Sequence, residues 1–411
     1  MLPEGWLEGR VSNLVSALET GVSVNGENRP KKPDEKAVLK VSAVSYGCFD
    51  KNACKVISNE ELKRARINPK AGRIIISRSN TGKLVGASVF IEKNYDDLFL
   101  PDKLWQMVPK SHSDMRWLSY ILSSKKSRYA FSNLATGTSG SMKNITKSEL
   151  LGLKIFIPPL PEQKKIARTL STWDKAIETV EKLIKNSKTQ KKALMQQLLT
   201  GKRRLPGFDK LWKKGYLGDI CLFKGGSAFK EVYQGEPEGK LPFIKVSDMN
   251  LPGNSIYIKY ANNWISESVA KEIKAKPFPA ESVVFAKVGA ALLLNKRRIL
   301  EQETIIDNNM MAAIPNNDCN TNYLYQLMLT IDFAKLVQDG VVPSINQSSL
   351  SRFKIWFPKL KEQQQIAALL TTADKKTETL QQKLDCLKQE KKALMQQLLT
   401  GKRRVKVDVD G

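Results

Sequence analysis

Two long stretches of the chain carry apolar residues at spacings that alternate between four and three. No Pro or Gly interrupts residues 162–200, Pro161 lies just before this stretch, and Gly201 follows it. These are start and stop signals, and the spacing is that of a coiled-coil seam. The pattern predicts a helix about 57 Å long. The apolar residues of this first seam are Ile166, Leu170, Trp173, Ile177, Val180, Ile184, Leu194 and Leu198.

The second stretch repeats the first after 200 residues. The fourteen letters KKALMQQLLTGKRR occur at 191–204 and again at 391–404, and the pattern P-x-L-x-EQ-x-x-IA occurs at 158–167 and 358–367. This period is far longer than that of a solenoid, so it indicates a duplicated domain with its tail. The second seam comprises Ile366, Leu370, Ala373, Thr377, Leu380, Leu384, Leu387, Lys391, Leu394 and Leu398.

The two seams match when the helices run antiparallel and paired residue numbers sum to 564. Ser187 then meets Thr377, a polar layer that could hold the register. Lys191 faces Ala373, and Trp173 faces Lys391, whose ammonium can reach solvent. The apolar pairs are Ile166–Leu398, Leu170–Leu394, Ile177–Leu387, Val180–Leu384, Ile184–Leu380, Leu194–Leu370 and Leu198–Ile366. The alternative is that each helix packs only on the domain that precedes it.

The regions before each helix differ from one another and mix short β-rich runs with helical patterns. Strands are predicted at 73–77, 283–288 and 353–357, and amphipathic helices at 116–131 and 322–338. Trp6 and Trp212 open the two regions and are expected to be core anchors.

The predicted fold is therefore α+β with pseudo-two-fold organisation. Two mixed α/β domains are separated by two long helices that form an antiparallel coiled coil. The predicted segments are a first domain at 1–157, a central helix at 158–204, a second domain at 205–357, a C-terminal helix at 358–404 and a tail at 405–411.

The net charge of +26, from 67 Lys and Arg against 41 Asp and Glu, points to a polyanionic partner. No run of about 18 apolar residues and no signal-peptide pattern is present, so a cytoplasmic protein without membrane spans is expected. Five scattered cysteines and the single His112 favour neither a metal site nor a catalytic triad.

The sequence lacks the motifs of the enzymes that act on nucleic acids. It contains no P-loop, no Rossmann GxGxxG and no NPP[FY] tetrad of amino-methyltransferases, so we expect no cofactor and no catalysis by the chain itself. Asp34, Glu61 and Lys63 form a loose nuclease-like pattern, which is common by chance. The GKRR segments could bind phosphate, but their position at both helix ends favours helix capping or docking of a partner.

Two pairs of loops offer candidate DNA contacts, since Arg, Asn and Gln suit base edges whereas Lys and Thr suit phosphates. The first pair is 78–86 and 286–298, which follow predicted strands, and the second is 135–146 and 340–350. Lys40 and Lys245 belong to the similar segments VLKVS and FIKVS. The candidates are Lys40, Arg78, Asn80, Thr81, Lys83, Lys143, Asn144, Lys245, Lys287, Asn295, Lys296, Arg297, Arg298, Ser344, Asn346 and Gln347.

With these features the whole chain resembles the specificity subunit of a type I restriction–modification enzyme. The resemblance lies in the duplicated layout, the P-x-L-x-EQ-x-x-IA and LMQQLLTGKRR segments, and FIKVSDM and VLKVSAV. VLKVSAV lacks the counterpart of Asp248, so contacts inferred for one domain need not transfer to the other.

The resemblance implies that each domain reads one part of a split, asymmetric DNA target. The helices would set the spacer and dock two adenine methyltransferase subunits, which bind S-adenosylmethionine and flip the target adenine. A motor and nuclease subunit would join and use ATP. The alternatives are a specificity subunit of an orphan methylation complex, a non-specific nucleic-acid scaffold, a nuclease that uses Asp34, Glu61 and Lys63, or a membrane-surface protein.

Overall fold

The computed structural model describes residues 3–139, 142–337 and 342–407. The chain forms two compact units, and each unit takes half of each long helix. Unit 1 comprises residues 1–180 and 383–411, and unit 2 comprises 181–382. The compact units do not coincide with the five predicted segments, because each unit combines one domain with parts of both long helices. The bounds of the five segments therefore stay a prediction.

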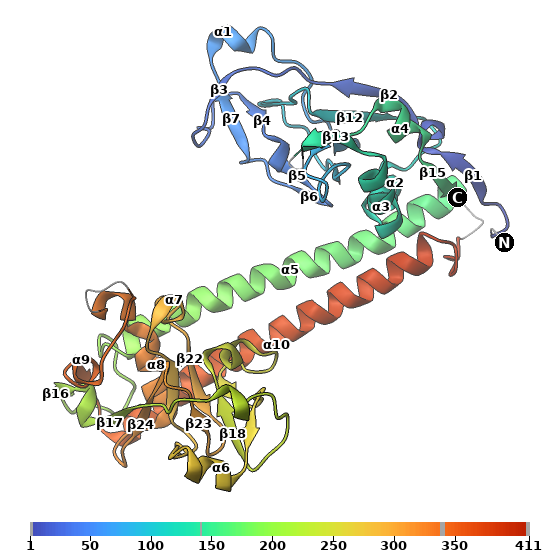
Figure 1. The fold of residues 1–411 in the computed structure, drawn as a ribbon. Helices are drawn as coiled ribbons and strands as arrows, with labels where there is room; N and C mark the ends of the chain where they lie inside the picture. The colour runs from blue at the N-terminus through green and yellow to red at the C-terminus, as the bar shows by residue number, and fades with distance from the viewer. Residues whose placement is uncertain (1–2, 140–141, 338–341, 408–411) are drawn as a thin grey trace. The chain divides into compact units, whose positions relative to one another are not determined.

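In the part of unit 1 that the structure describes, the variable domain has four small sheets and a two-stranded ribbon (Figure 1). The strand orders are β10-β8-β12-β2, β11-β4-β7-β3, β13-β14-β9, β5-β6 and β1-β15. The strands are β1 (Leu7–Arg10), β2 (Val15–Thr20), β3 (Gly26–Glu27), β4 (Ala37–Leu39), β5 (Val44–Ser45), β6 (Cys48–Phe49), β7 (Cys54–Ile57), β8 (Ile74–Ser77), β9 (Ser79–Asn80), β10 (Ser88–Phe90), β11 (Leu98–Phe99), β12 (Leu104–Pro109), β13 (Thr136–Ser139), β14 (Met142–Asn144) and β15 (Lys154–Ile157). Its short helices are α1 (Asn59–Leu62), α2 (Met115–Ser123), α3 (Lys125–Leu134) and α4 (Lys147–Gly152).

The described residues of unit 2 form a five-stranded, a three-stranded and a two-stranded sheet. The orders are β17-β24-β21-β22-β19, β20-β18-β23 and β16-β25. The strands are β16 (Lys213–Tyr216), β17 (Cys221–Gly225), β18 (Leu241–Ile244), β19 (Tyr257–Ile258), β20 (Trp264–Ile265), β21 (Val283–Ala286), β22 (Arg297–Leu300), β23 (Ile305–Ile306), β24 (Met310–Pro315) and β25 (Lys354–Phe357). Its short helices are α6 (Glu267–Glu272), α7 (Gly289–Leu293), α8 (Thr321–Thr330) and α9 (Gln347–Ser351).

Both predicted amphipathic helices are interrupted. Residues 116–131 fall in α2 and α3, because the hydroxyl of Ser124 caps α3 and its extended backbone ends α2. The second pattern begins in α8 and continues as a short 3-10 turn capped by Asp332, and its residue 338 lies outside the described residues. Local side-chain capping thus overrides continuous apolar periodicity.

The two long helices are α5 (Leu160–Leu198) and α10 (Leu360–Leu398). In unit 1, Ile166 belongs to the same apolar cluster as Leu398, and in unit 2 Leu198 belongs to the cluster of Ile366. Within each unit the helix halves therefore run antiparallel. The predicted fold class of two α+β parts and two antiparallel long helices is confirmed.

The seam residues differ in burial along the helices. Those that are buried are Ile166, Leu170, Val180, Ile184, Leu198, Ile366, Leu370, Leu384 and Leu398. Those that are partly exposed are Trp173, Ile177, Leu194, Leu380, Leu387 and Leu394.

Polar contacts mark the helix register in each unit. In unit 2 the hydroxyls of Ser187 and Thr377 lie 2.8 Å apart, and Lys191 pairs with Asp374 at 2.6 Å. The ammonium of Lys191 thus binds the residue next to the predicted Ala373. In unit 1 Lys391 pairs in the same way with Asp174, the neighbour of Trp173.

Candidate nucleic-acid interface

The two predicted loops of unit 1, at 78–86 and 135–146, meet at the end of a buried strand. β8 is fully buried, and the carbonyl oxygen of the next residue, Arg78, accepts a hydrogen bond from the backbone N–H of Ile145 at 2.9 Å. β9 then pairs with β14, with Asn80 opposite Lys143. The structure therefore brings the 78–83 segment and the 142–144 segment together.

Unit 2 repeats this junction with different residues. β21 is buried, and the carbonyl oxygen of Lys287 accepts from the N–H of Ile345 at 3.0 Å. Val288 bridges to Ser344, and the amine of Lys287 and the amide of Gln347 both lie beside Gly225. Residues 140–141 and 340–341 of the predicted loops lie outside the described residues.

The candidates of unit 1 vary in how free they are to bind. Thr81 and Lys83 are exposed, whereas Arg78, Lys143 and Asn144 are half-buried. The Arg78 guanidinium lies 5.6 Å from the centroid of the Trp105 ring. The Asn80 amide is engaged locally, because it donates to Ser77 and accepts from the N–H of Thr81.

Arg297 of unit 2 is a core residue, which corrects the prediction of an exposed loop. It opens β22 and is fully buried. Its guanidinium donates to the carbonyl oxygen of Ile331 at 2.9 Å and lies 3.7 Å from the centroid of the Phe333 ring. Burial lowers the pKa of Arg297 to about 10. A guanidinium held in this way cannot reach a base edge.

Two neighbours of Arg297 also have structural partners. Asn295 adopts a φ of 52° and accepts hydrogen bonds from Arg297 and from the N–H of Phe333. Arg298 is half-buried and donates to the carbonyl oxygen of Asn254 at 2.6 Å. Lys296 is exposed and donates to the side chain of Asn250.

Most of the remaining candidates lie at the starts of short helices. Lys40 donates to Asn28, and Lys245 donates to Gln234 at 2.8 Å. Asn346 caps α9 by accepting from the N–H of Ser349 at 2.7 Å. Gln347, the next residue, is exposed, and Ser344 is half-buried.

Asp248 of FIKVSDM has a structural role. It is fully buried and accepts from the N–H groups of Lys245 and Asn262 at 2.6 and 3.0 Å. Two backbone donors therefore use its carboxylate to hold the turn after β18. The missing counterpart in VLKVSAV changes how this turn is held in unit 1.

A clasp missed by sequence reasoning closes each unit. In unit 1 the carboxylate of Glu162, which is 2% exposed, accepts from the Trp6 indole at 3.1 Å and binds Arg404 at 2.9 Å. In unit 2 Glu362 accepts from Trp212 and Arg204 in the same way. The repeated EQ and GKRR letters were the available signal, but their pairing across the duplication was not visible.

The glutamine of each EQ pair fastens the variable domain to its helix. Gln163 accepts from the N–H of Asp114 at 2.9 Å and donates to the carbonyl oxygen of Pro158 at 2.9 Å. Gln363 makes the equivalent bonds with Asn320 and Pro358. The helix openings therefore position α2 and α8, whose N-caps are Asp114 and Asn320.

The described residues contain no group of three or more His, Cys, Asp or Glu placed to hold a metal ion. No helix among them is long and apolar enough to cross a membrane. The Glu61 carboxylate of the nuclease-like pattern binds Arg64 at 2.9 Å, and His112 lies on the surface near the carbonyl oxygen of Asn13.

The two units share their helix openings, clasps and loop junctions but differ in loop sequence. This arrangement is typical of a duplicated recognition protein with two variable domains. The type I restriction modification DNA specificity domain matches residues 3–187 and again residues 209–389. The chain therefore belongs to this family of type I restriction–modification specificity subunits.

One relative matches along nearly its whole length and another over less than half of it. The chain is 26% identical to a protein of Methanocaldococcus jannaschii named as the MjaX specificity subunit of a type I restriction enzyme, over 98% of this chain and 95% of that one. It is 25% identical to the EcoKI specificity subunit of Escherichia coli, over 46% and 40% of the two chains.

Two solved structures share the fold. The S subunit of a type I restriction–modification system from M. genitalium superposes with a TM-score of 0.63 at 18% identity, over 96% of both chains. A chain from a structure that describes assembly of a type I system gives 0.56 at 17% identity, over 98% of this chain and 100% of that one.

Proposed function

We propose that the chain reads a bipartite, asymmetric sequence in duplex DNA, with one part read by each unit. One observation carries this proposal. Ile145 binds the carbonyl oxygen of Arg78, and Ile345 binds that of Lys287, so one backbone junction presents loops of unlike sequence in both units. A shared support with different contact residues suits two different half-sites.

The loops at the two junctions differ in chemistry as well as in sequence. Unit 1 places polar residues after its junction, and Thr81 and Lys83 are exposed. Unit 2 inserts α7, after which Leu294 is 63% exposed. Polar side chains suit hydrogen bonds to base edges, whereas apolar ones suit thymine methyl groups. The two half-sites would therefore differ in base composition.

The proposed partners include two copies of an adenine methyltransferase subunit. The segments 191–204 and 391–404 are identical at exposed positions as well as buried ones, although much of the remaining sequence of the two halves diverged. Helix packing explains identity at Leu198 and Leu398, but not at solvent-facing Gln196 and Gln396. Two equal copies of one partner, each using one segment, would explain it.

Unit 1 offers a docking surface for such a partner. An apolar groove of about 560 Å³ lies between α10, α3 and β15. One wall is formed by the end of α10 and the two residues that follow it. All seven of its residues have the same residue type 200 positions earlier in the chain, namely Lys388, Lys391, Lys392, Met395, Gln396, Leu399 and Thr400. Basic residues around an apolar floor suit an amphipathic segment with acidic flanks.

In this proposal the chain supplies recognition and scaffold and performs no catalysis. Methyl transfer would be the task of the docked subunits, which bind S-adenosylmethionine. A motor and nuclease subunit would add ATP-driven restriction. The proposed location is the cytoplasm, in contact with genomic DNA.

Exchange of one domain tests half-site reading. Residues 1–155 would be replaced with the corresponding domain of a relative, and methyladenine positions would be sequenced in cells that also express the methyltransferase subunit. We expect one half of the methylated motif to change and the other half to stay. Exchange of residues 205–355 is the matched control and should change the opposite half. A motif that is unchanged, or equal protection of all duplexes in footprinting, would contradict the proposal.

Charge reversal at the repeated segments tests docking. K192E/Q196E and K392E/Q396E alter equivalent exposed positions in the two helices. We expect each variant to bind one methyltransferase copy instead of two, and the combined variant to bind none, as measured by native mass spectrometry. Two copies retained by the combined variant would reject these segments as docking sites.

A further inference from the structure

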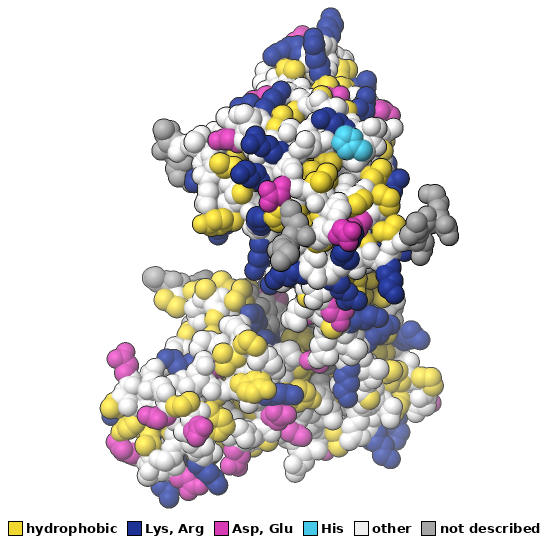
Figure 2. Space-filling view, turned by 90° about the vertical axis from the view of Figure 1, so that its right-hand side faces the viewer, with side chains coloured by type: hydrophobic (Ala, Val, Ile, Leu, Met, Phe, Trp, Pro, Cys, Tyr) yellow, Lys and Arg dark blue, Asp and Glu magenta, His cyan; other side chains and the backbone are white. Residues whose placement is uncertain are grey.

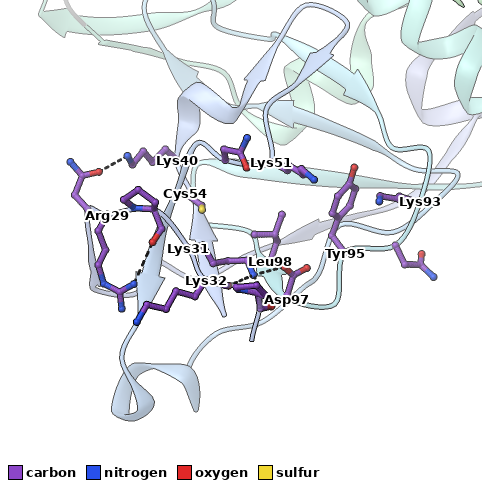
Figure 3. A pocket seen from close by; sticks show the side chains of 15 residues that line it. Arg29, Lys31, Lys32, Lys40, Lys51, Cys54, Lys93, Tyr95, Asp97 and Leu98 are labelled. Carbon is purple, nitrogen blue, oxygen red and sulfur yellow. Dashed lines mark hydrogen bonds and ion pairs between the residues drawn. The ribbon is translucent and has the colours of Figure 1, made fainter. Parts of the chain in front are cut away.

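Unit 1 contains a basic hollow outside the loop junction. The hollow has a volume of about 680 Å³ and lies beside β4, β7 and β11, as Figure 3 shows. Its walls come from segments that are far apart in sequence, at 28–33, 51–54 and 93–98, together with Lys40. The fold therefore gathers these side chains into one concave surface, the basic basin.

The basin carries a strong excess of positive charge. Six of its lining residues are cationic and one, Asp97, is anionic. Burial alone would raise the pKa of Asp97, but the ion pair with Lys31 and the nearby Lys51 lower it below its usual value. The six cations are Arg29, Lys31, Lys32, Lys40, Lys51 and Lys93.

The cations of the basin divide into two groups. Arg29 binds Glu35 at 2.7 Å and Lys31 binds Asp97 at 2.8 Å, so these two are fixed by carboxylates. Lys32, Lys51 and Lys93 are exposed, and none of the three pairs with a carboxylate among the described residues. Fixed cations shape the wall, while the exposed ammonium groups are available to an incoming anion.

Unit 2 has no equal excess of charge at the corresponding place. Lys245, the counterpart of Lys40, is hydrogen-bonded to Gln234 in a segment that also contains Glu236 and Glu238. Residues 28–40 hold five basic and two acidic residues, but residues 230–245 hold three of each. The net charge is +10 for residues 1–157 and +3 for residues 205–357. Figure 2 shows one face of the unit that carries the single histidine, with several Lys and Arg side chains spread over it.

We propose that the basic basin binds the phosphate backbone of duplex DNA beside the half-site that unit 1 reads, and that unit 1 thereby supplies most of the salt-sensitive affinity. This inference rests on the proposed function. The lysines of the basin present point charges, and the amides of Asn28, Asn52 and Asn94 add neutral donors to the same wall. Lys and amide side chains are typical partners of phosphate oxygens and carry no sequence information.

The triple variant K32Q/K51Q/K93Q tests the basin in the full-length chain. It removes three charges from exposed positions, so the fold should be unaffected. Each lost phosphate contact lowers the slope of log Kd against log salt by about 0.9, so we expect a slope smaller by about 2 to 3 and binding weaker by about ten-fold or more. The loss should be equal for target and non-target duplexes, measured by fluorescence anisotropy.

The matched control is K259Q/K271Q/K276Q, which removes three exposed lysines from unit 2. We expect it to change the slope by less than half as much. Equal salt slopes for the two variants would overturn the proposal that the basin binds DNA. The same holds if the triple variant loses binding of inorganic tripolyphosphate while its DNA binding is unchanged. A triple variant that binds weakly but still directs methylation to the same motif would support it. A wild-type chain that binds no duplex would overturn the proposed function as well.

Discussion

The two units have the same internal fastening but differ in their surfaces. Each unit holds its variable domain by a Trp–Glu–Arg clasp and by a glutamine at the helix opening. Among the described residues, unit 1 gathers exposed lysines in a hollow, whereas unit 2 inserts a helix at its loop junction. The duplication thus preserved the contacts that hold domain and helix together, whereas the loop residues at the two junctions diverged.

The clasps also differ in how the chain connects them. Arg204 binds Glu362 through two contacts of 2.8 Å and donates to the carbonyl oxygen of Lys210, which leads directly to Trp212. Arg404 binds Glu162 at 3.3 and 2.9 Å, and no short connecting segment leads from it to Trp6. The clasp of unit 1 therefore depends on side chains alone.

The largest expected effect comes from the equivalent core leucines Leu170 and Leu370, both fully buried. Replacement of either with Ala should lower the free energy of unfolding by about 2 to 5 kcal/mol, because a cavity remains. Hydrogen exchange should place the loss in unit 1 for L170A and in unit 2 for L370A. L369A, at a position 47% exposed, is the control and should have little effect. If both variants lost hydrogen-exchange protection in the same unit, Leu170 and Leu370 would not have equivalent roles.

A smaller effect is expected at the clasps, from E162Q in unit 1 and E362Q in unit 2. Each change weakens the bond to arginine and costs about 1 to 3 kcal/mol. We expect hydrogen exchange at 395–404 in E162Q to rise more than at 195–204 in E362Q, because the connecting segment keeps Arg204 near Trp212. Equal rises would show that chain connection has no influence.

Exchange of the mid-helix layers should have a modest effect. Unit 2 uses Ser187 and Thr377, whereas Ile177 and Leu387 take the equivalent places in unit 1. S187L/T377I transfers the apolar layer and should change the unfolding free energy of unit 2 by less than about 1.5 kcal/mol, with either sign, as urea unfolding would show. Loss of about 3 kcal/mol or more would mean that the polar layer itself supports unit 2.

The smallest expected effect is a difference in response to alkaline pH. Burial raises the pKa of Cys319 and of Tyr325 to about 12, and raises that of Cys221 as well. A group with a raised folded pKa stabilises fully below its unfolded pKa and loses this contribution as pH rises toward the folded value. Between about pH 9 and 12, unit 2 should lose up to about 1.4 kcal/mol per pH unit for each such group.

Unfolding of the C221A/C319A variant would check this response. The variant should show a flatter dependence on pH in unit 2, whereas C54A in unit 1, where burial raises the pKa of Cys54 less strongly, should show little change. An identical slope in C221A/C319A and the unaltered chain would exclude the two thiols as the cause.

The helices and their direction were predictable because heptad spacing, Pro and Gly signals and the 200-residue repeat all act locally or through simple pairing. Burial of Arg297 was not predictable, because it depends on Phe333 and Ile331 from a distant segment. The clasp was missed for the same reason, since Glu162 and Arg404 are far apart in sequence. DNA contact by individual loop residues stays a prediction.

The division of the chain has a consequence for the order of folding during synthesis. Unit 2 is one continuous stretch, residues 181–382, whereas unit 1 joins residues 1–180 to residues 383–411. During synthesis from the N-terminus, all residues of unit 2 therefore leave the ribosome before the last residues of unit 1 do. Unit 2 can fold before unit 1 is complete. Until the end of the final helix emerges, Leu170 and Trp6 keep apolar surface exposed. A nascent chain stalled near residue 380 would therefore bind chaperones at its N-terminal unit.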